Sequence, residues 1–252
     1  EMSGNDIGVW FTFETKPNEV IYVQTGVSFV SAENALLNLD TEQRGFDFHK
    51  VKSEAETAWE QALRTVEVEG GTAEQRTVFY TALYHLLVHP NILQDVNGEY
   101  PMMGSLRTGK TRHDRYTVYS LWDTYRALHP LLTIINPDRA LRYGRSLVSD
   151  YDEGTILPRW PLASNYTGCM PAYHSVSVLA DLVAKGIAKD EDLRHWTEAA
   201  QRSSIYREDL AQKFAGSREL DLITRHPYFK EKYGFIPADS VPESVSWGVE
   251  MA

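Results

Sequence analysis

The stretch YSLWDTYRALHP, residues 119–130, places a carboxylate, a guanidinium and several aromatic rings close together. Asp123 and Arg126 could bond to the hydroxyls of a sugar, while the indole of Trp122 could stack on its C–H face. The same residues could form an ordinary amphipathic helix, in which Arg126, at i+3, pairs with Asp123. A carboxylate among apolar neighbours is costly to bury without such a partner. The segment therefore predicts either one wall of a sugar site or a helix with an internal ion pair.

Two further segments carry residues suited to the same site. In LPRWP, Trp160 lies between Pro158 and Pro161, and each proline fixes the backbone beside it. An indole held in this way suits a binding platform, and a plug in the core is the alternative. In GCMPAYHSV, His174 lies in the first turn of a helix predicted over residues 170–186. We expect its side chain to face the loop of Trp160, as a hydrogen-bond donor to a ligand or as a structural histidine.

Patterns that could bind a metal are incomplete. His85 and His89 share a helix face, but no glutamate follows His85 as H-E-x-x-H requires. We interpret one as capping the end of the helix and the other as packed against its neighbours. Asp95, Asn97 and Glu99 alternate as in a calcium loop, but the closing glutamate of an EF-hand is missing. We interpret this loop as a solvated turn and assign no metal ligand.

The elements that must position these residues are mostly helical. Residues 8–30 predict a strand hairpin, which needs further strands for stability. From residue 53 the apolar period becomes helical, and two helices open with capping boxes, Ser53 with Glu56 and Thr72 with Gln75. Other helices are predicted near residues 116–135, 138–149, 170–186, 190–215 and 218–230. We expect strands before about residue 50, then helices to the end of the chain, with no second sheet.

Composition narrows the class of protein. The 252 residues can bury a substantial core, and 42% hydrophobic with 24% charged residues is ordinary for a globular protein. The net charge of -10 argues against nucleic acid as a partner. No apolar run reaches the roughly 20 residues of a membrane span, and the polar opening EMSGNDIG is not a signal peptide. The single cysteine, Cys169, excludes an intrachain disulfide, and we expect it to be buried.

Five stretches, taken in order, resemble one family. They are GVSFVSAENALLNL, VFYTALYHLLVHPN, YSLWDTYRALHPLLTI, LPRW and GCMPAYHSV. Together they resemble the glycoside hydrolase family 92 α-mannosidases, and YSLWDTYRALHPL is the most specific of them. The resemblance runs from about residue 8 to the end of the chain. The chain departs from the family pattern at Ala172 and Tyr173, where many members carry glycine and aspartate, and at Trp247, where a basic residue is expected.

The resemblance implies both an architecture and an activity. Members of the family join an N-terminal β-sandwich to an (α/α)6 toroid. The expected fold class is therefore mainly α, with residues 1–50 as the C-terminal part of the sandwich and residues 51–252 as the first part of the toroid. The implied activity is the exo-acting, inverting, calcium-dependent hydrolysis of terminal α-linked mannose from glycans. By the same resemblance, Asp123 and Trp160 match residues that hold the terminal mannose, and Trp122, Arg126 and His174 are their neighbours and supports.

The catalytic groups that the resemblance implies are expected elsewhere. An inverting hydrolase needs a carboxylic acid and a carboxylate base about 6.5–9.5 Å apart. In the family these lie in segments like EGNAWQY and GNDDCGQMSAW, and a segment like HGNEP helps to form the calcium site. None of these strings occurs in this sequence. We therefore expect the acid, the base and most Ca²⁺ ligands beyond residue 252, in the rest of the polypeptide, and we assign no catalytic residue here.

Two other classes of function stay open. Another (α/α)6 glycosidase, trehalase-like or glucosidase-like, would hold a gluco-configured sugar at Asp123. A sugar-binding fragment without chemistry would hold the sugar only, and the coding sequence past residue 252 would distinguish it from a hydrolase. Enzymes of the resembled family generally act on glycans outside the cytoplasm, which implies a secreted, periplasmic or cell-surface protein.

Overall fold

The computed structural model describes residues 8–170, 173–205, 207–213 and 232–235. The helix expected near residues 218–230, as well as Ala172 and Trp247, lies outside them. Within them the chain is mainly helical, as expected. The helices are α1 (Ala32–Glu42), α2 (Phe48–Leu63), α3 (Ala73–Val88), α4 (Leu121–Thr124), α5 (Leu128–Ile135), α6 (Pro137–Gly154), α7 (His174–Ala184), α8 (Asp190–Ser203) and α9 (Glu208–Lys213).

The segment before α2 differs from the expected hairpin. Residues 8–30 run without a strand, although a turn forms where Glu19 N donates to Lys16 O at 3.1 Å. Two strands alone are marginal, because one ladder buries too little apolar surface. Helix α1, which the periodicity did not reveal, follows at once and is capped by Ser31, whose side chain accepts from Asn34 N.

The next two helices test the capping signals directly. Helix α3 begins as predicted, with Thr72 as its N-cap and a complete capping box with Gln75. Helix α2 begins earlier than predicted, at Phe48, because Asp47 accepts from Lys50 N and caps it first. Ser53 therefore lies inside the helix and caps nothing there.

Six short strands lie between residues 91 and 166, so the expectation of helices to the end with no second sheet is wrong. They form three antiparallel pairs, β1 with β4, β2 with β3 and β5 with β6. Each has two or three residues, too few to show a period of two in the sequence. Their bounds are β1 (Asn91–Ile92), β2 (Glu99–Pro101), β3 (Thr108–Lys110), β4 (Tyr116–Thr117), β5 (Pro161–Leu162) and β6 (Asn165–Tyr166).

The helix predicted over residues 116–135 is divided into α4 and α5. Pro130 is the third residue of α5, where the backbone N–H has no partner within the helix and proline is tolerated. A continuous helix would instead have placed Pro130 in its interior. Helix α4 is therefore a single turn at the end of the β4 segment.

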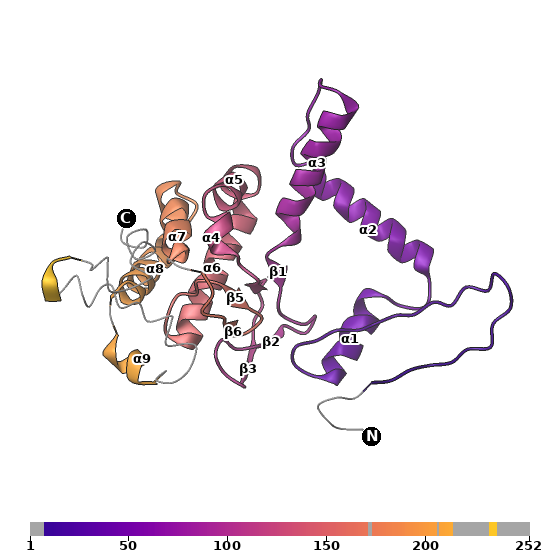
Figure 1. Cartoon of the computed structure of the whole chain (residues 1–252), viewed down its shortest axis with the longest axis horizontal. Coiled ribbons are helices and arrows are strands. Elements are labelled where there is room, and N and C mark those ends of the chain that lie inside the picture. Colours follow the sequence, from indigo (N-terminus) through magenta and orange to yellow (C-terminus); the bar gives the residue numbers. More distant parts are fainter. Residues whose placement is uncertain (1–7, 171–172, 206, 214–231, 236–252) are drawn as a thin grey trace.

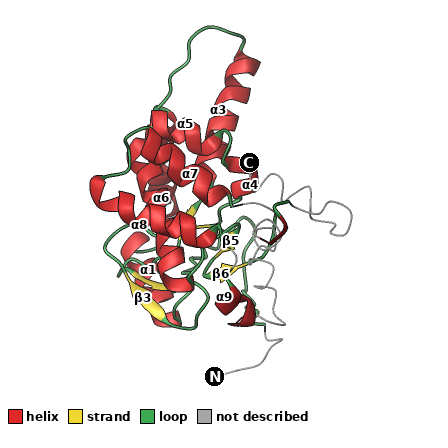
Figure 2. Cartoon of the chain, turned by 90° about the vertical axis from the view of Figure 1, so that its left-hand side faces the viewer, coloured by secondary structure: helices red, strands yellow, loops and turns green. Residues whose placement is uncertain are grey.

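The main core lies among α5, α6, α7 and α8, which pack side by side (Figures 1 and 2). Gly144 on α6 permits this close approach, because a Cβ there would lie 2.7 Å from Leu182 Cδ1 and 2.8 Å from Trp196 Cη2. In the described part of the chain, no helix is both long enough and apolar enough to span a membrane. The fully or nearly fully buried core includes Tyr119, Leu121, Leu132, Tyr143, Leu147, Leu157, Leu179, Leu182, Trp196 and Ala199.

Candidate functional site

Asp123 lies on the exposed side of α4, so it is not a carboxylate buried among apolar neighbours. Its Oδ2 accepts a hydrogen bond from Ser120 Oγ at 2.6 Å. Arg126 does not pair with it. The Arg126 Nε donates instead to the hydroxyl of Tyr125 at 2.6 Å, and its guanidinium lies 5.1 Å from the centre of that ring. The alternative of a helix with an internal Asp123–Arg126 ion pair is therefore wrong, and the Asp123 carboxylate is exposed.

Trp160 is held as its prolines predict. Pro158 and Pro161 are fully buried, while the indole is half-buried. The backbone carbonyl of Trp160 accepts from Thr167 Oγ1 at 2.6 Å, and its Nε1 donates to Ser120 Oγ at 3.0 Å. The indole is thus tied to α4, the helix that carries Asp123.

His174 begins α7, as predicted, and its side chain is 5% exposed. Its ring stacks on Tyr125, with ring centres 3.7 Å apart and an interplanar angle of 8°. The Trp122 ring lies 5.4 Å away at 49°. Arg126 completes this group through Tyr125. His174 therefore supports the α4 turn. Trp122 contacts its ring directly, and Arg126 is linked to it through Tyr125.

The structure thus brings the sequence-predicted residues together around α4. Two contributors escaped the sequence reasoning. Ser120 joins Asp123 to Trp160, and Tyr125 joins His174 to Arg126. Serine directly before a helix is a capping signal, but nothing in the sequence shows that its hydroxyl meets a residue in the LPRWP loop.

A buried charge cluster lies apart from this group. Arg115 Nη2 contacts Asp150 Oδ1 at 2.7 Å and Glu153 Oε2 at 3.3 Å. Burial raises the pKa of Asp150 to about 7, and the guanidinium of Arg115 limits the rise. Shifted carboxyl groups often mark catalytic sites. Here Asp150 is 2% exposed and Arg115 is 3% exposed, so the cluster is closed to a substrate, and we assign it to the support of the β2–β4 segments.

The acidic loop at residues 95–99 joins α1 to the strands and is not the solvated turn expected from the sequence. Asp95 is 6% exposed. Its Oδ2 accepts from Ser28 Oγ at 2.7 Å and from Asn34 Nδ2 at 2.8 Å, and its Oδ1 accepts from Asn38 Nδ2 at 2.7 Å. Hydrogen bonds from Asn34 and Asn97 lower the pKa of Glu99.

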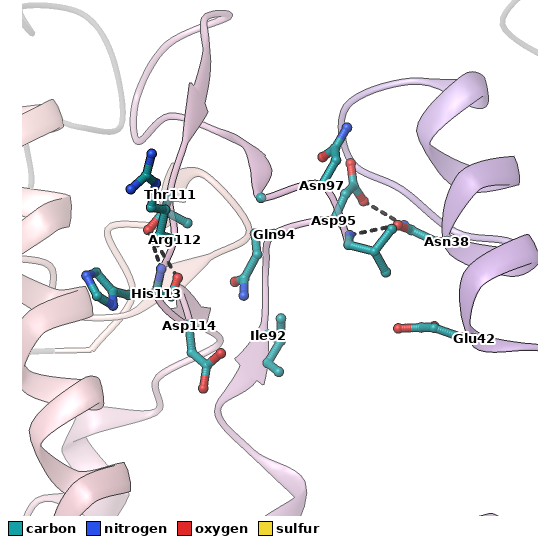
Figure 3. Close-up of a pocket in the computed structure, with 12 residues that line it drawn as sticks. Asn38, Glu42, Ile92, Gln94, Asp95, Asn97, Thr111, Arg112, His113 and Asp114 are labelled. Carbon is teal, nitrogen blue, oxygen red and sulfur yellow. Dashed lines mark hydrogen bonds between the residues drawn. The ribbon is translucent and has the colours of Figure 1, made fainter.

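A polar cleft of about 360 Å³ lies between this loop and α1 (Figure 3). Asn38 joins α1 to the Asp95 loop at this cleft, because its Oδ1 also accepts from Val96 N at 2.9 Å. Among the residues that the structure describes, no three His, Cys, Asp or Glu side chains are grouped to hold a metal ion. The carboxylates of Asp95 and Glu99 already accept from amides and a hydroxyl. Because these carboxylate oxygens already accept hydrogen bonds within the protein, we assign no calcium ligand to this loop.

Cys169 and the two histidines of α3 are the other residues that the sequence singled out. Cys169 is exposed, which contradicts the expected burial. It lies in the loop before α7, where Cys169 N donates to Thr167 Oγ1 at 3.2 Å. His89 ends α3 as its C-cap, and its Nδ1 lies 2.6 Å from Asn91 Oδ1. His85 is exposed on the same helix, so the expectation that the second histidine is packed is wrong.

Comparisons with known proteins place this arrangement in a family. The profile described as "Glycosyl hydrolase family 92 catalytic domain" matches residues 34–252. An uncharacterized secreted glycosidase of Arthroderma benhamiae is 32% identical over 126 residues, which is 47% of this chain and 15% of that protein.

Solved structures agree with the profile. The family GH92 α-mannosidase BT3965 of Bacteroides thetaiotaomicron, solved in complex with mannoimidazole, is similar with a TM-score of 0.67 and 34% identity over 72% of this chain. The family GH92 inverting mannosidase BT2199 of the same organism is similar with a TM-score of 0.74 and 30% identity over 86% of this chain. The chain spans 24% of the first and 28% of the second. Because the profile covers most of its length, the chain belongs to glycosyl hydrolase family 92.

Proposed function

We propose that this chain is the sugar-holding part of an α-mannosidase that removes terminal α-linked mannose from glycans. The observation that carries the proposal is the group formed by Asp123, Ser120 and Trp160, which sets an outward-facing carboxylate beside a held indole. Two relatives that are at least 30% identical bear the name mannosidase. Their names support mannose as the sugar, in preference to a gluco-configured one.

Each residue has a role in this proposal. The Asp123 carboxylate accepts hydrogen bonds from sugar hydroxyls, and the Trp160 indole packs against the C–H face of the ring. The His174 ring packs against the rings of Trp122 and Tyr125 and so supports the α4 turn. Arg126 lies at the exposed edge of the group, where its guanidinium could reach the next sugar of the glycan.

Hydrolysis itself needs groups that this site does not provide. We propose that the mechanism is inverting, so that one carboxylic acid protonates the leaving oxygen while a second carboxylate activates a water. We assign both to the rest of the longer protein, outside this chain, together with most ligands of a calcium ion. When bound, that ion would add positive charge beside the sugar. No step is assigned to the residues of the Asp95 loop.

We also propose that the protein acts outside the cytoplasm. The relative from Arthroderma benhamiae is named a secreted glycosidase, and enzymes of the resembled family generally act on glycans outside the cytoplasm. The proposed substrate is therefore a mannose-bearing glycan outside the cell membrane.

The test compares the isolated chain, the longer protein that contains it, and that protein with Asp123→Ala. Release of mannose from an aryl α-mannoside is measured, with the first-formed anomer read by NMR. We expect no turnover by the isolated chain, since the acid and the base are assigned to the rest of the longer protein. We expect β-mannose from the longer protein. Asp123→Ala should lower kcat/KM at least about tenfold, because a charged hydrogen bond contributes ~1.5–3 kcal/mol.

Each result has a distinct meaning. Robust turnover by the isolated chain would show that the acid and base lie within it. α-Mannose as the first product would overturn the inverting mechanism. A glucoside hydrolysed in place of the mannoside would favour another (α/α)6 glycosidase. Full activity of the Asp123→Ala protein would remove Asp123 from the sugar site.

A further inference from the structure

The hydroxyl of Ser120 is engaged in an unusual way for its position. Ser120 is the N-cap residue of α4, where a serine side chain normally accepts from a backbone N–H of the first turn. Its side chain makes no such cap hydrogen bond. The hydroxyl instead donates to Asp123 Oδ2 at 2.6 Å and accepts from Trp160 Nε1 at 3.0 Å.

These two contacts match what one hydroxyl can do. A serine hydroxyl has one proton to donate and lone pairs to accept with, and an indole N–H can only donate. Ser120 must therefore give its proton to Asp123 while it receives the Trp160 N–H. The direction of both bonds is fixed, so the carboxylate and the indole are oriented through a single atom.

The fold does not depend on this bridge. The α4 turn has its own backbone bonds, from Asp123 N and Thr124 N to Ser120 O at 3.0 and 3.1 Å. The hairpin after Trp160 is tied to β4 by Thr117 Oγ1, which donates to Ala163 O at 2.8 Å. Asp123 is exposed and Trp160 is half-buried, so the bridge lies near solvent and contributes little to stability. Orientation of the two side chains is what it supplies.

We propose that Ser120 is a positioning residue that holds Asp123 and Trp160 in the geometry needed to bind the terminal sugar. The proposal rests on the proposed function, because it assigns Ser120 to the same site. Without the hydroxyl, the Asp123 carboxylate can rotate about its side-chain torsions, and the indole loses the contact that fixes its edge. Both groups must then be ordered when the sugar binds, which weakens binding.

The effect should fall on substrate binding. Contacts to the terminal sugar that are the same in the ground state and the transition state affect KM and leave kcat unchanged. We expect Ser120→Ala in the longer protein to raise KM about 3- to 10-fold, as for the loss of a hydrogen bond, with kcat within about twofold of the wild type. Ser120→Thr keeps the hydroxyl and should restore most of the loss. A variant that is merely unstable would lower the apparent kcat and leave KM unchanged.

A spectroscopic readout follows the bridge without turnover. The protein is labelled with 5-fluorotryptophan, and the Trp160 fluorine signal is identified by its loss in Trp160→Phe. We expect Ser120→Ala to shift that signal and Ser120→Thr to return it toward the wild-type position. Ser149→Ala is the matched control, because the Ser149 hydroxyl donates only within α6, to Arg145 O at 2.9 Å. It should change neither KM nor the Trp160 signal.

The outcomes separate this inference from the proposed function. A wild-type protein that hydrolyses no α-mannoside would overturn the proposed function. An active wild type with an unchanged KM in Ser120→Ala would overturn the role of Ser120 and leave the function standing. A raised KM that Ser120→Thr does not restore would also overturn it, since a steric change would then explain the effect.

Discussion

At the scale of single residues, burial decides which side chains can carry charge. His129 on α5 is 3% exposed, and its ring lies 6.2 Å from that of Tyr119 and 6.0 Å from that of Tyr143. Its Nε2 has no hydrogen-bond partner among the described residues. Burial therefore lowers the pKa of His129 to about 4, with a small opposing effect from Asp181. Asp123 is the opposite case, since its carboxylate is exposed and available to a ligand.

The lowered pKa of His129 predicts a loss of stability in acid. Above pH 6.5 the folded and unfolded chains are both neutral at this residue. As the pH falls from 6.5 to about 4, the unfolded chain binds a proton that the folded chain does not. The free energy of unfolding should fall by about 3 kcal/mol over this window. Urea denaturation at pH 7 and pH 4 measures the drop in unfolding free energy between the two pH values. We expect this drop to be about 3 kcal/mol smaller for His129→Phe than for the wild type. Equal losses would mean that His129 binds a proton in the folded chain.

At the scale of elements, α6 carries two ionic clusters with different surroundings. On its buried side, Asp150 and Glu153 pair with Arg115. On its outer side, Arg145 contacts Glu191 at 3.1 Å and Asp192 at 3.0 Å, with 40% of its side chain exposed. A buried cluster that loses one member leaves uncompensated charge, while an exposed pair is screened by water.

We therefore expect the two arginines of these clusters to differ in their effect on stability. Arg115→Met should lower the free energy of unfolding by about 3–5 kcal/mol, because two buried carboxylates lose their partner. Arg145→Met, the matched control, should cost about 1 kcal/mol or less. Urea denaturation of both variants at neutral pH measures the difference. A similar small loss in both would show that Asp150 and Glu153 are reached by water.

The elements also show how far local sequence signals reach. The capping box of Thr72 with Gln75 located the start of α3, because both contacts are made within one turn. The box at Ser53 misled, because Asp47 caps α2 earlier. The short strands were invisible, since two or three residues are too few to show a period of two. The Ser120 bridge was invisible for another reason, as Trp160 lies in a loop 40 residues further along the chain. Residue types located Asp123 and Trp160, but not what joins them.

At the scale of the whole molecule, burial is unevenly distributed. Helices α5 to α8 enclose the main core, while α2 has no buried residue and α3 has one, Leu83. Figure 1 shows α2 and α3 standing away from the α5–α8 group. Trp59 and Tyr84 contact each other across this pair, with ring centres 4.5 Å apart. Apolar side chains such as Val78 and Phe79 remain exposed, so tertiary packing stabilises these two helices only weakly.

This uneven burial predicts separate local stabilities along the isolated chain. Amide hydrogens exchange through local opening when few buried contacts hold a helix, and only through global unfolding in a core. Backbone amides of α2 should therefore exchange on the order of 100-fold faster than those of α6, or more, since global stabilities are typically ~5–15 kcal/mol. Hydrogen exchange followed by mass spectrometry of peptides from residues 48–63 and 137–154 measures this ratio. Equal protection of the two helices would mean that α2 is covered in solution. The ratio should be insensitive to Ser120→Ala, because the bridge at α4 lies outside both helices and orients side chains without holding either helix.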